Sequence, residues 1–216
     1  MSKRPMTFDK TIERQTCGQP QTGMLVAGVD EAGRGPIAGP VVAAAVLPAG
    51  NHMPDGIADS KTLTRNQREC LYDRILDAFA CSIGFVDVAT IDRINILAAS
   101  MLAMRIAVEQ LRPIPDLVLV DGPHVPPGLP VPGQAMVRGD ARHQSIGAAS
   151  ILAKVIRDRY MQFLALEFPQ YGWERNAGYP TGFHLSALKE SGVTRHHRRT
   201  FRPVAEALSR KDRPVS

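Results

Sequence analysis

Short apolar runs that end in glycine-containing turns alternate along this chain with longer stretches of helical periodicity. Five of the runs are rich in aliphatic residues or alternate in polarity, as strands do. They cover residues 24–30, 39–47, 81–88, 116–122 and 135–140. The turn EAGRGPIAG joins the first two runs and suits a hairpin-like connection with a widened loop. We therefore predict five strands.

Three stretches between or after these runs have the apolar spacing of helices. They cover residues 62–80, 90–111 and 145–168. The second is predicted to be one long amphipathic helix with Thr90 as its N-cap. The third begins with two turns of mostly small residues, which would let its axis approach a sheet closely. A loop and a short helix are expected to follow within 169–192.

The order of these elements indicates the fold class. Strand, strand, helix, strand, helix, strand, strand and helix is an order typical of an α/β domain in which helices cover a mixed sheet. A doubly wound nucleotide-binding fold would need a regular alternation of strands and helices, which this order lacks. The chain has 216 residues and 44% hydrophobic residues, enough for one domain with an appendage.

Neither end of the chain nor its apolar runs predict contact with a membrane. The first 20 residues are polar throughout and lack the apolar core of a signal peptide. The longest weakly polar run, 38–50, is short and interrupted by proline and glycine, so it could not span a bilayer. The three cysteines match neither a metal-binding nor a disulfide spacing. We expect a cytoplasmic protein with no membrane partner.

The net charge of +5 comes from the end of the chain. From residue 195 onward there are seven basic and two acidic residues, which leaves 19 of each in the first 194. The basic ones are Arg195, Arg198, Arg199, Arg202, Arg210, Lys211 and Arg213. Such a tail is typical of a patch that faces a polyanion such as nucleic acid. A solvated tail without a partner accounts for the charge equally well.

Four carboxylates share one sequence context, since each lies where an apolar run gives way to a glycine-containing turn. They are Asp30, Glu31, Asp121 and Asp140. If their strands belong to one sheet, the ends can converge on one rim, where the carboxylates would repel one another unless a cation lay among them. Oxygen ligands favour Mg²⁺ or Mn²⁺, and two such ions about 3.5–4 Å apart are the usual arrangement for displacement at a phosphodiester. Alternatively, each Asp-Gly or Gly-Asp pair is simply a turn.

Adjacent residues of a regular strand point to opposite faces, so Asp30 and Glu31 can face one metal only if the strand breaks there. Gly33 and Gly35 favour such a break. The Gly33-Arg34-Gly35 turn would also expose its backbone amides beside an arginine, as a cradle for a sugar-phosphate backbone does. The alternative is a tight turn with no ligand. The chain contains no P-loop motif, which disfavours a P-loop NTPase.

Taken together, six motifs of this chain closely resemble those of bacterial ribonuclease HII, in the same order and at compatible intervals from about Val26 to Arg202. The motifs are GVDEAGRGPIAGPVVAAAV, DSKTL, IDRINILAAS, LVLVDG, RGDARHQSIGAASILAKVIRDRYM and NAGYPTGFH. The resemblance implies a ribonuclease H-like fold with a mixed five-stranded sheet, flanking helices and a helical C-terminal extension. We expect a polar leader at 1–22, a ribonuclease H-like catalytic domain at 23–168 and a helical, basic extension at 169–216 packed on that domain.

The resemblance also implies an activity and a site. The family's four catalytic and metal-binding acids fall on Asp30, Glu31, Asp121 and Asp140. Its ribose-sensing motif falls on Gly33, Arg34 and Gly35, and its sugar-stacking tyrosine falls on Tyr179. The implied reaction, with Mg²⁺ or Mn²⁺, is hydrolysis of the RNA strand of RNA–DNA hybrids and cleavage on the 5′ side of a ribonucleotide in duplex DNA. The implied products carry a 5′-phosphate and a 3′-hydroxyl, and we expect a monomer.

Two other kinds of function remain open. One is a hybrid-binding module of the same fold without catalysis, and the other is a two-metal DNA nuclease that does not sense ribose. Lys61 and Lys154 could contact phosphates or be solvated. His184 is predicted to order the Tyr179 loop, and Trp173 is predicted to pack in the core.

Overall fold

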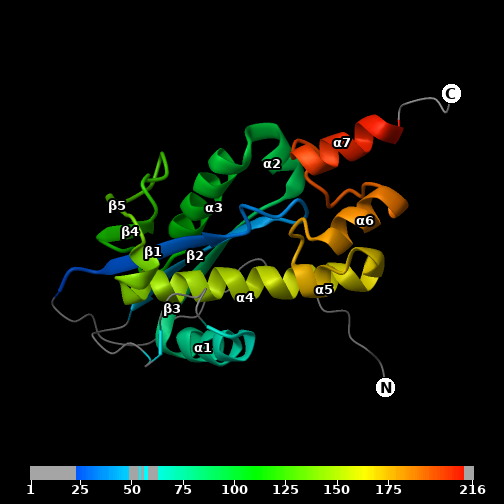
Figure 1. The fold of residues 1–216 in the computed structure, drawn as a ribbon. Coiled ribbons are helices and arrows are strands. Elements are labelled where there is room, and N and C mark those ends of the chain that lie inside the picture. Colours follow the sequence, from blue (N-terminus) through cyan, green and yellow to red (C-terminus); the bar gives the residue numbers. More distant parts are fainter. Residues whose placement is uncertain (1–22, 49–53, 55, 58–62, 212–216) are drawn as a thin grey trace, which may run out of the picture.

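Five strands form one mixed sheet in the order β3-β2-β1-β4-β5 in the computed structural model, which describes residues 23–48, 54, 56–57 and 63–211 (Figure 1). β1 is antiparallel to β2, and β2 to β3, whereas β4 is parallel to β1 and β5 to β4. The strands are β1 (Val26–Ala32), β2 (Val41–Pro48), β3 (Phe79–Val86), β4 (Leu117–Asp121) and β5 (Gly133–Met136). The predicted fold class is confirmed.

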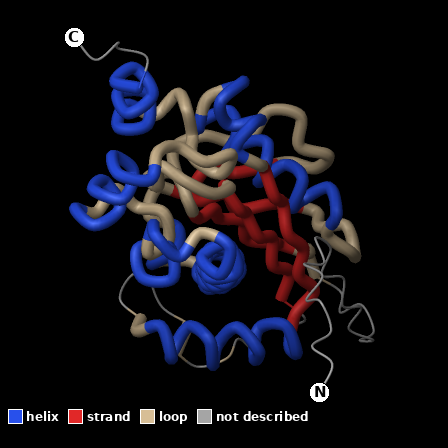
Figure 2. Tube along the Cα trace, turned by 90° about the vertical axis from the view of Figure 1, so that its right-hand side faces the viewer, coloured by secondary structure: helices blue, strands red, loops and turns tan. Residues whose placement is uncertain are grey.

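Helices cover both faces of the sheet (Figure 2). Alternate residues of β2 point to opposite faces, as a strand requires. Val41, Ala43 and Ala45 pack in a core under helix α3 (Ile96–Gln110), while Val42, Ala44 and Val46 pack in a second core under α1 (Arg65–Ala78) and α4 (Gln144–Glu167). The all-apolar sequence of β2 therefore reflects a strand that is buried on both faces.

The predicted long helix over 90–111 is wrong, because it is two helices. α2 covers Val88–Ile94 and α3 begins at Ile96, with Asn95 between them at a φ of 67°. The Asn95 side chain accepts hydrogen bonds from the amides of Leu97 and Ala98 at the start of α3, so it caps the second helix. Thr90 is not an N-cap, since Asp87 caps α2 and accepts the Thr90 amide.

Glycines in the strands let the helices approach the sheet closely, as the small residues of 145–168 predict. A Cβ built on Gly28 would overlap the backbone of Ser145 in α4, and one on Gly84 would overlap the Ala103 carbonyl in α3. Ser82, two residues from Gly84, donates a 2.6 Å hydrogen bond to the carbonyl of Ala107. Backbone of helix and strand thus meet directly where no side chain intervenes.

The C-terminal part of the chain lies against the C-terminal end of α4 and the loop between β1 and β2 (Figure 1). Its elements are η2 (Pro169–Tyr171), α5 (Trp173–Asn176), α6 (Gly182–Ser191) and α7 (Arg202–Lys211). Loop residues Ile37 and Ala38 are buried against it. Backbone bonds join the two segments, with Gly39 N–H donating to His196 and Arg198 N–H donating to Ile37, each at 2.8 Å.

Two further predictions concern the leader and membranes. The predicted polar leader, 1–22, lies outside the described residues. Across the part of the chain that the structure describes, every helix is too short or too polar to cross a bilayer.

Replacing Gly84 by Ala should test the close contact between α3 and β3. The added Cβ would overlap the Ala103 carbonyl, so the helix must shift, and we expect the free energy of unfolding to fall by about 1–3 kcal/mol. Gly182→Ala is the matched control, because nothing lies within 4 Å of a Cβ there. Urea denaturation of the two variants should separate them, and equal stability would contradict the close approach.

Candidate active site

The four predicted acids come from neighbouring elements at one rim of the sheet. Asp30 and Glu31 lie in β1, and Asp121 is the last residue of β4, which pairs in parallel with β1. Asp140 lies in the short helix η1 (Gly139–Ala141). The amides of Gly139 and Asp140 donate to Asp121 Oδ1 at 2.8 and 3.4 Å, which joins η1 to the end of β4.

Two details of this arrangement differ from expectation. β1 does not break at the acidic pair, since Asp30 pairs with Ala44 and Glu31 with Ala43 in a regular ladder that continues to Ala32. Asp140 does not end a strand, because β5 ends at Met136 and Asp140 follows in η1.

Asp30 and Glu31 therefore start from opposite faces of β1. The expectation that only a strand break could bring them together is wrong, because a side-chain hydrogen bond joins the two carboxyl groups although β1 continues. Asp30 shares its face with α4, where Ser150 forms a hydrogen bond with its carboxyl group. Glu31 shares its face with α3 and contacts Arg34, with 3.3 Å between Glu31 Oε1 and Arg34 Nη1. Sequence reasoning missed Ser150, because a serine in a run of small helical residues has no chemical signature of its own.

Burial is the main cause that raises the pKa of both members of the acidic pair, and the charge of Asp121 adds to both shifts. Asp30 is 5% exposed, and burial raises its pKa well above the usual range, with the charges of Glu31 and Asp121 acting in the same direction. The Ser150 hydroxyl and the amide of Glu31, 2.7 Å from Asp30 Oδ1, oppose the shift. Burial also raises the pKa of Glu31, and Arg34 opposes this. The folded protein thus holds carboxylates whose charge a nearby cation would stabilise.

The donor set fits a hard divalent cation. All four candidate side chains offer carboxylate oxygens, which Mg²⁺ and Mn²⁺ prefer. Within the described ranges, no three acidic, histidine or cysteine side chains lie close enough together to form a ready-made ligand cluster. The carboxylates are therefore neighbours, with Asp30 repelled by Glu31 and Asp121, rather than a preformed coordination sphere.

The Gly33-Arg34-Gly35 turn follows directly after β1 and meets Tyr179. Gly33 has a φ of 101°, and a Cβ there would overlap the side chain of Arg157. A Cβ built on Gly35 would lie 3.2 Å from Tyr179 Cε1, so the ring lies directly over this glycine. Tyr179 is 44% exposed, which leaves part of its ring open beside the turn.

A buried histidine holds the backbone of Tyr179. His184 Nδ1 lies 2.9 Å from the Tyr179 carbonyl oxygen, and its Nε2 lies 3.1 Å from both Trp173 Nε1 and His197 Nε2. Since a carbonyl can only accept, Nδ1 carries the proton and Nε2 accepts from Trp173 Nε1. This contact agrees with the predicted ordering role of His184, and Trp173, which has no exposed surface, packs as predicted.

The basic tail is only partly a surface charge. Arg198 is fully buried, so counting it with the solvent-facing charges was wrong. Arg195 pairs with Glu167 and Arg202 pairs with Glu206, at 2.8 and 2.7 Å. Arg213 lies outside the described residues.

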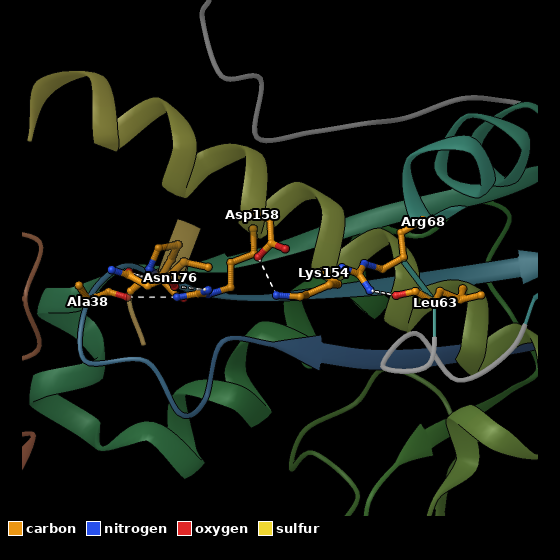
Figure 3. Close-up of polar contacts among 10 residues, drawn as sticks. Ala38, Leu63, Arg68, Lys154, Asp158 and Asn176 are labelled. Atoms are coloured by element: carbon orange, nitrogen blue, oxygen red, sulfur yellow. Dashed lines mark hydrogen bonds and ion pairs between the residues drawn. The ribbon is translucent and has the colours of Figure 1, made fainter. Parts of the chain in front are cut away.

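The two predicted lysines are accounted for differently. Lys154 is paired with Asp158 at 2.8 Å, as Figure 3 shows. Lys61 lies outside the described residues.

Comparison with known proteins identifies the family. The fold and the acidic rim define a metal-dependent nuclease of the ribonuclease H type. The model of the family "Ribonuclease HII" matches residues 27–204. Ribonuclease HII of Paracoccus denitrificans is 54% identical over 188 residues, 87% of this chain and 90% of that protein. Ribonuclease HII of Polaromonas sp. is 55% identical over 185 residues, 85% of this chain and 92% of that protein. The chain belongs to the ribonuclease HII family and is a ribonuclease H.

Solved structures agree with this assignment. Ribonuclease H2 from Pyrococcus horikoshii superposes with a TM-score of 0.75 at 31% identity, covering 87% of this chain and 98% of that one. RNase HII of Archaeoglobus fulgidus, solved in complex with PCNA, superposes with a TM-score of 0.67 at 27% identity, covering 83% of this chain and 96% of that one. Bst-RNase HIII, solved in complex with Mn²⁺, shares the fold with a TM-score of 0.71 at 17% identity, covering 88% of this chain and 71% of that one.

Asp30→Asn should raise the melting temperature of the metal-free protein at pH 8. The raised pKa of Asp30 means that folding favours its protonated form, so the native state loses stability as the pH rises through that pKa. Asn removes the charge and keeps the size. The gain should shrink as the pH falls toward the pKa of the unfolded chain, about 3.9, where Asp30 is protonated in both states.

Differential scanning calorimetry in EDTA would measure this effect. Asp73→Asn, an exposed carboxylate on α1, is the control and should change the melting temperature little. A lower melting temperature for Asp30→Asn at pH 8 would show that the charge is stabilised in the fold rather than held against repulsion.

Proposed function

We propose that this ribonuclease hydrolyses the RNA strand of RNA–DNA hybrids and cuts on the 5′ side of a ribonucleotide embedded in duplex DNA. Asp30, Glu31, Asp121 and Asp140 are the catalytic and metal-binding residues. The products carry a 5′-phosphate and a 3′-hydroxyl. One observation carries the proposal: a rim of four neighbouring carboxylates, in which the buried Asp30 is repelled by Glu31 and Asp121, continues directly into a glycine turn that contacts a half-exposed tyrosine ring.

The acidic rim is proposed to hold Mg²⁺ or Mn²⁺. Bound divalent ions would supply an activated water and stabilise the leaving 3′ oxygen. The chain's own part is to orient the ligands: Ser150 and the Glu31 amide hold the Asp30 carboxylate, and the amides of η1 hold that of Asp121. Arg34 contacts Glu31 and is 51% exposed, so it can reach the backbone of a bound strand without leaving the site.

Ribose recognition is proposed to combine the Gly33-Arg34-Gly35 turn with Tyr179. A glycine turn lets a sugar approach the backbone closely, and its peptide groups can hydrogen-bond a 2′-hydroxyl. The ring of Tyr179, fixed by contact with Gly35, can stack on the next sugar. A site built to bond a hydroxyl rejects the analogue that lacks it by a large factor.

The proposed site spans the two proposed parts of the chain. The acids and the turn belong to the catalytic domain at 23–168, whereas Tyr179 belongs to the extension at 169–216. Burial of Ile37 and Ala38 against the extension supports treating the two parts as one functional unit. Because one chain supplies every proposed residue, a monomer suffices for activity.

Asp121→Asn should abolish metal-dependent cleavage while the protein stays folded. The substitution preserves the size of the side chain and removes a ligand charge, so hydrolysis of an RNA–DNA hybrid in Mg²⁺ should fall about a hundredfold or more. Asp73→Asn serves again as the surface control. Unimpaired Mg²⁺-dependent cleavage by Asp121→Asn would exclude this residue from the site, and binding without cleavage by the parent would favour a hybrid-binding module.

Ribose selectivity can be measured with duplex DNA that carries one ribonucleotide and with the all-DNA duplex of the same sequence. The all-DNA duplex should remain uncut, and Arg34→Ala and Tyr179→Ala should each lower cleavage at the ribonucleotide by about tenfold or more. Mapping the product ends by gel electrophoresis gives the cleavage side. Equal cutting of both duplexes would refute the ribose-sensing role of the turn and favour a DNA nuclease.

A further inference from the structure

Arg198 is a buried cation whose hydrogen bonds all lead to one loop. Its guanidinium has no exposed surface and donates to the carbonyls of Gly39, Arg34, Gly33 and Pro40, at 2.9, 3.1, 2.6 and 3.0 Å. None of these four acceptors is a carboxylate. The residue itself is anchored by its own N–H, which donates to Ile37, and by the ring of Phe201, 5.1 Å from the guanidinium carbon.

A second buried arginine completes the arrangement from α4. Arg157 is 1% exposed and donates to the carbonyls of Pro40, Ala177 and Ala38, at 3.0, 2.9 and 3.1 Å. Figure 3 labels Ala38, whose carbonyl accepts one of these hydrogen bonds. Ala177 stands two residues before Tyr179, so Arg157 joins the tyrosine segment to the loop after β1. Pro40 accepts from both arginines.

Two adjacent cations in a dry interior are unfavourable for stability. Burial and the charge of Arg157 lower the pKa of Arg198 to about 9, and burial lowers that of Arg157 to about 10, so both remain protonated at neutral pH. Packed apolar residues would fill this space at less cost. Stability alone therefore does not explain why two arginines are buried here. The backbone carbonyls that accept their hydrogen bonds indicate a further role.

The geometry of the peptide bond links these carbonyls to the substrate side of the turn. In a trans peptide the C=O of one residue and the N–H of the next point in opposite directions. Because Arg198 holds the carbonyls of Gly33 and Arg34 on the buried side, the amides of Arg34 and Gly35 point away from it. Glycine peptides rotate easily, and an arginine that binds two successive carbonyls prevents that rotation.

We infer that Arg198 is a positioning residue for ribose recognition: it fixes the peptide planes of the Gly33-Arg34-Gly35 turn so that the amides of Arg34 and Gly35 face the bound strand. The inference rests on the proposed function of that turn. It assigns to the C-terminal segment, from which Arg198 comes, a part in distinguishing ribose from deoxyribose. Arg198 acts through the turn and does not touch the substrate.

The test compares the affinities of two duplexes for one enzyme. One duplex carries a single ribonucleotide and the other is all-DNA, with Ca²⁺ in place of Mg²⁺ to hold back cleavage, and fluorescence anisotropy gives both Kd values. The ratio of the two Kd values measures discrimination and does not depend on the fraction of folded protein. Arg198→Met should lower this ratio about tenfold, the size of one lost hydrogen bond. A ratio equal to that of the parent would overturn the inference.

Two further variants make the result decisive. Arg199→Met removes an exposed neighbouring arginine and should weaken the binding of both duplexes by the same factor. The ratio of the two Kd values should therefore stay unchanged. Arg198→Lys keeps the charge but has three donors for four carbonyls, so its ratio should fall between those of the parent and Arg198→Met. If Arg198→Met does not fold, Arg198→Lys decides, and an unchanged ratio overturns the inference. A parent enzyme that does not discriminate would instead overturn the proposed function.

Discussion

The carbonyl groups of the loop between β1 and β2 face inward onto two buried guanidiniums, and the geometry of the whole candidate site depends on that orientation. Gly33, Arg34, Gly39 and Pro40 accept from Arg198, and Arg157 adds Ala38 and Ala177. A loop rich in glycine has little conformational preference of its own. Rigid planar donors, each serving several carbonyls, supply the preference from outside the loop.

The same arrangement separates the two signs of charge in the interior. The hydrogen bonds of Arg157 and Arg198 go to backbone carbonyls, so neither guanidinium forms an ion pair with the acidic rim. Asp30 and Glu31 thus keep raised pKa values and repel Asp121, a state that an incoming divalent ion relieves. The fold holds its cations and its carboxylates in neighbouring but distinct networks, which suits a site that binds metal ions and phosphates together.

Pattern and motif predicted the strands, the mixed sheet and the four acids, because buried strands and turn residues leave periodic signals. The break at Asn95 was missed, since the apolar period runs through it. Continuation of β1 past Asp30 was missed because strand pairing with β2 outweighs the local freedom of glycine. Arg198 was counted as surface charge because its acceptors are backbone carbonyls, which sequence does not reveal. Arg157 did leave a signal, since it interrupts the buried stripe Ala149, Ala153, Met161 and Ala165 of α4.

The basic tail contains both exposed arginines and the buried Arg198, and this changes how its charge must be studied. Removing the segment after Gly192 would withdraw Arg198 from the turn and His197 from His184, which holds the Tyr179 carbonyl. Loss of activity after such a truncation would therefore mix a damaged recognition site with a weaker attraction for phosphate. Arg195, Arg199 and Arg202 are exposed and can be neutralised without touching the buried network. Their contribution belongs to counterion release and its salt dependence. The basic end of the chain thus combines a surface that can attract a polyanion with a buried arginine that shapes the backbone the polyanion meets.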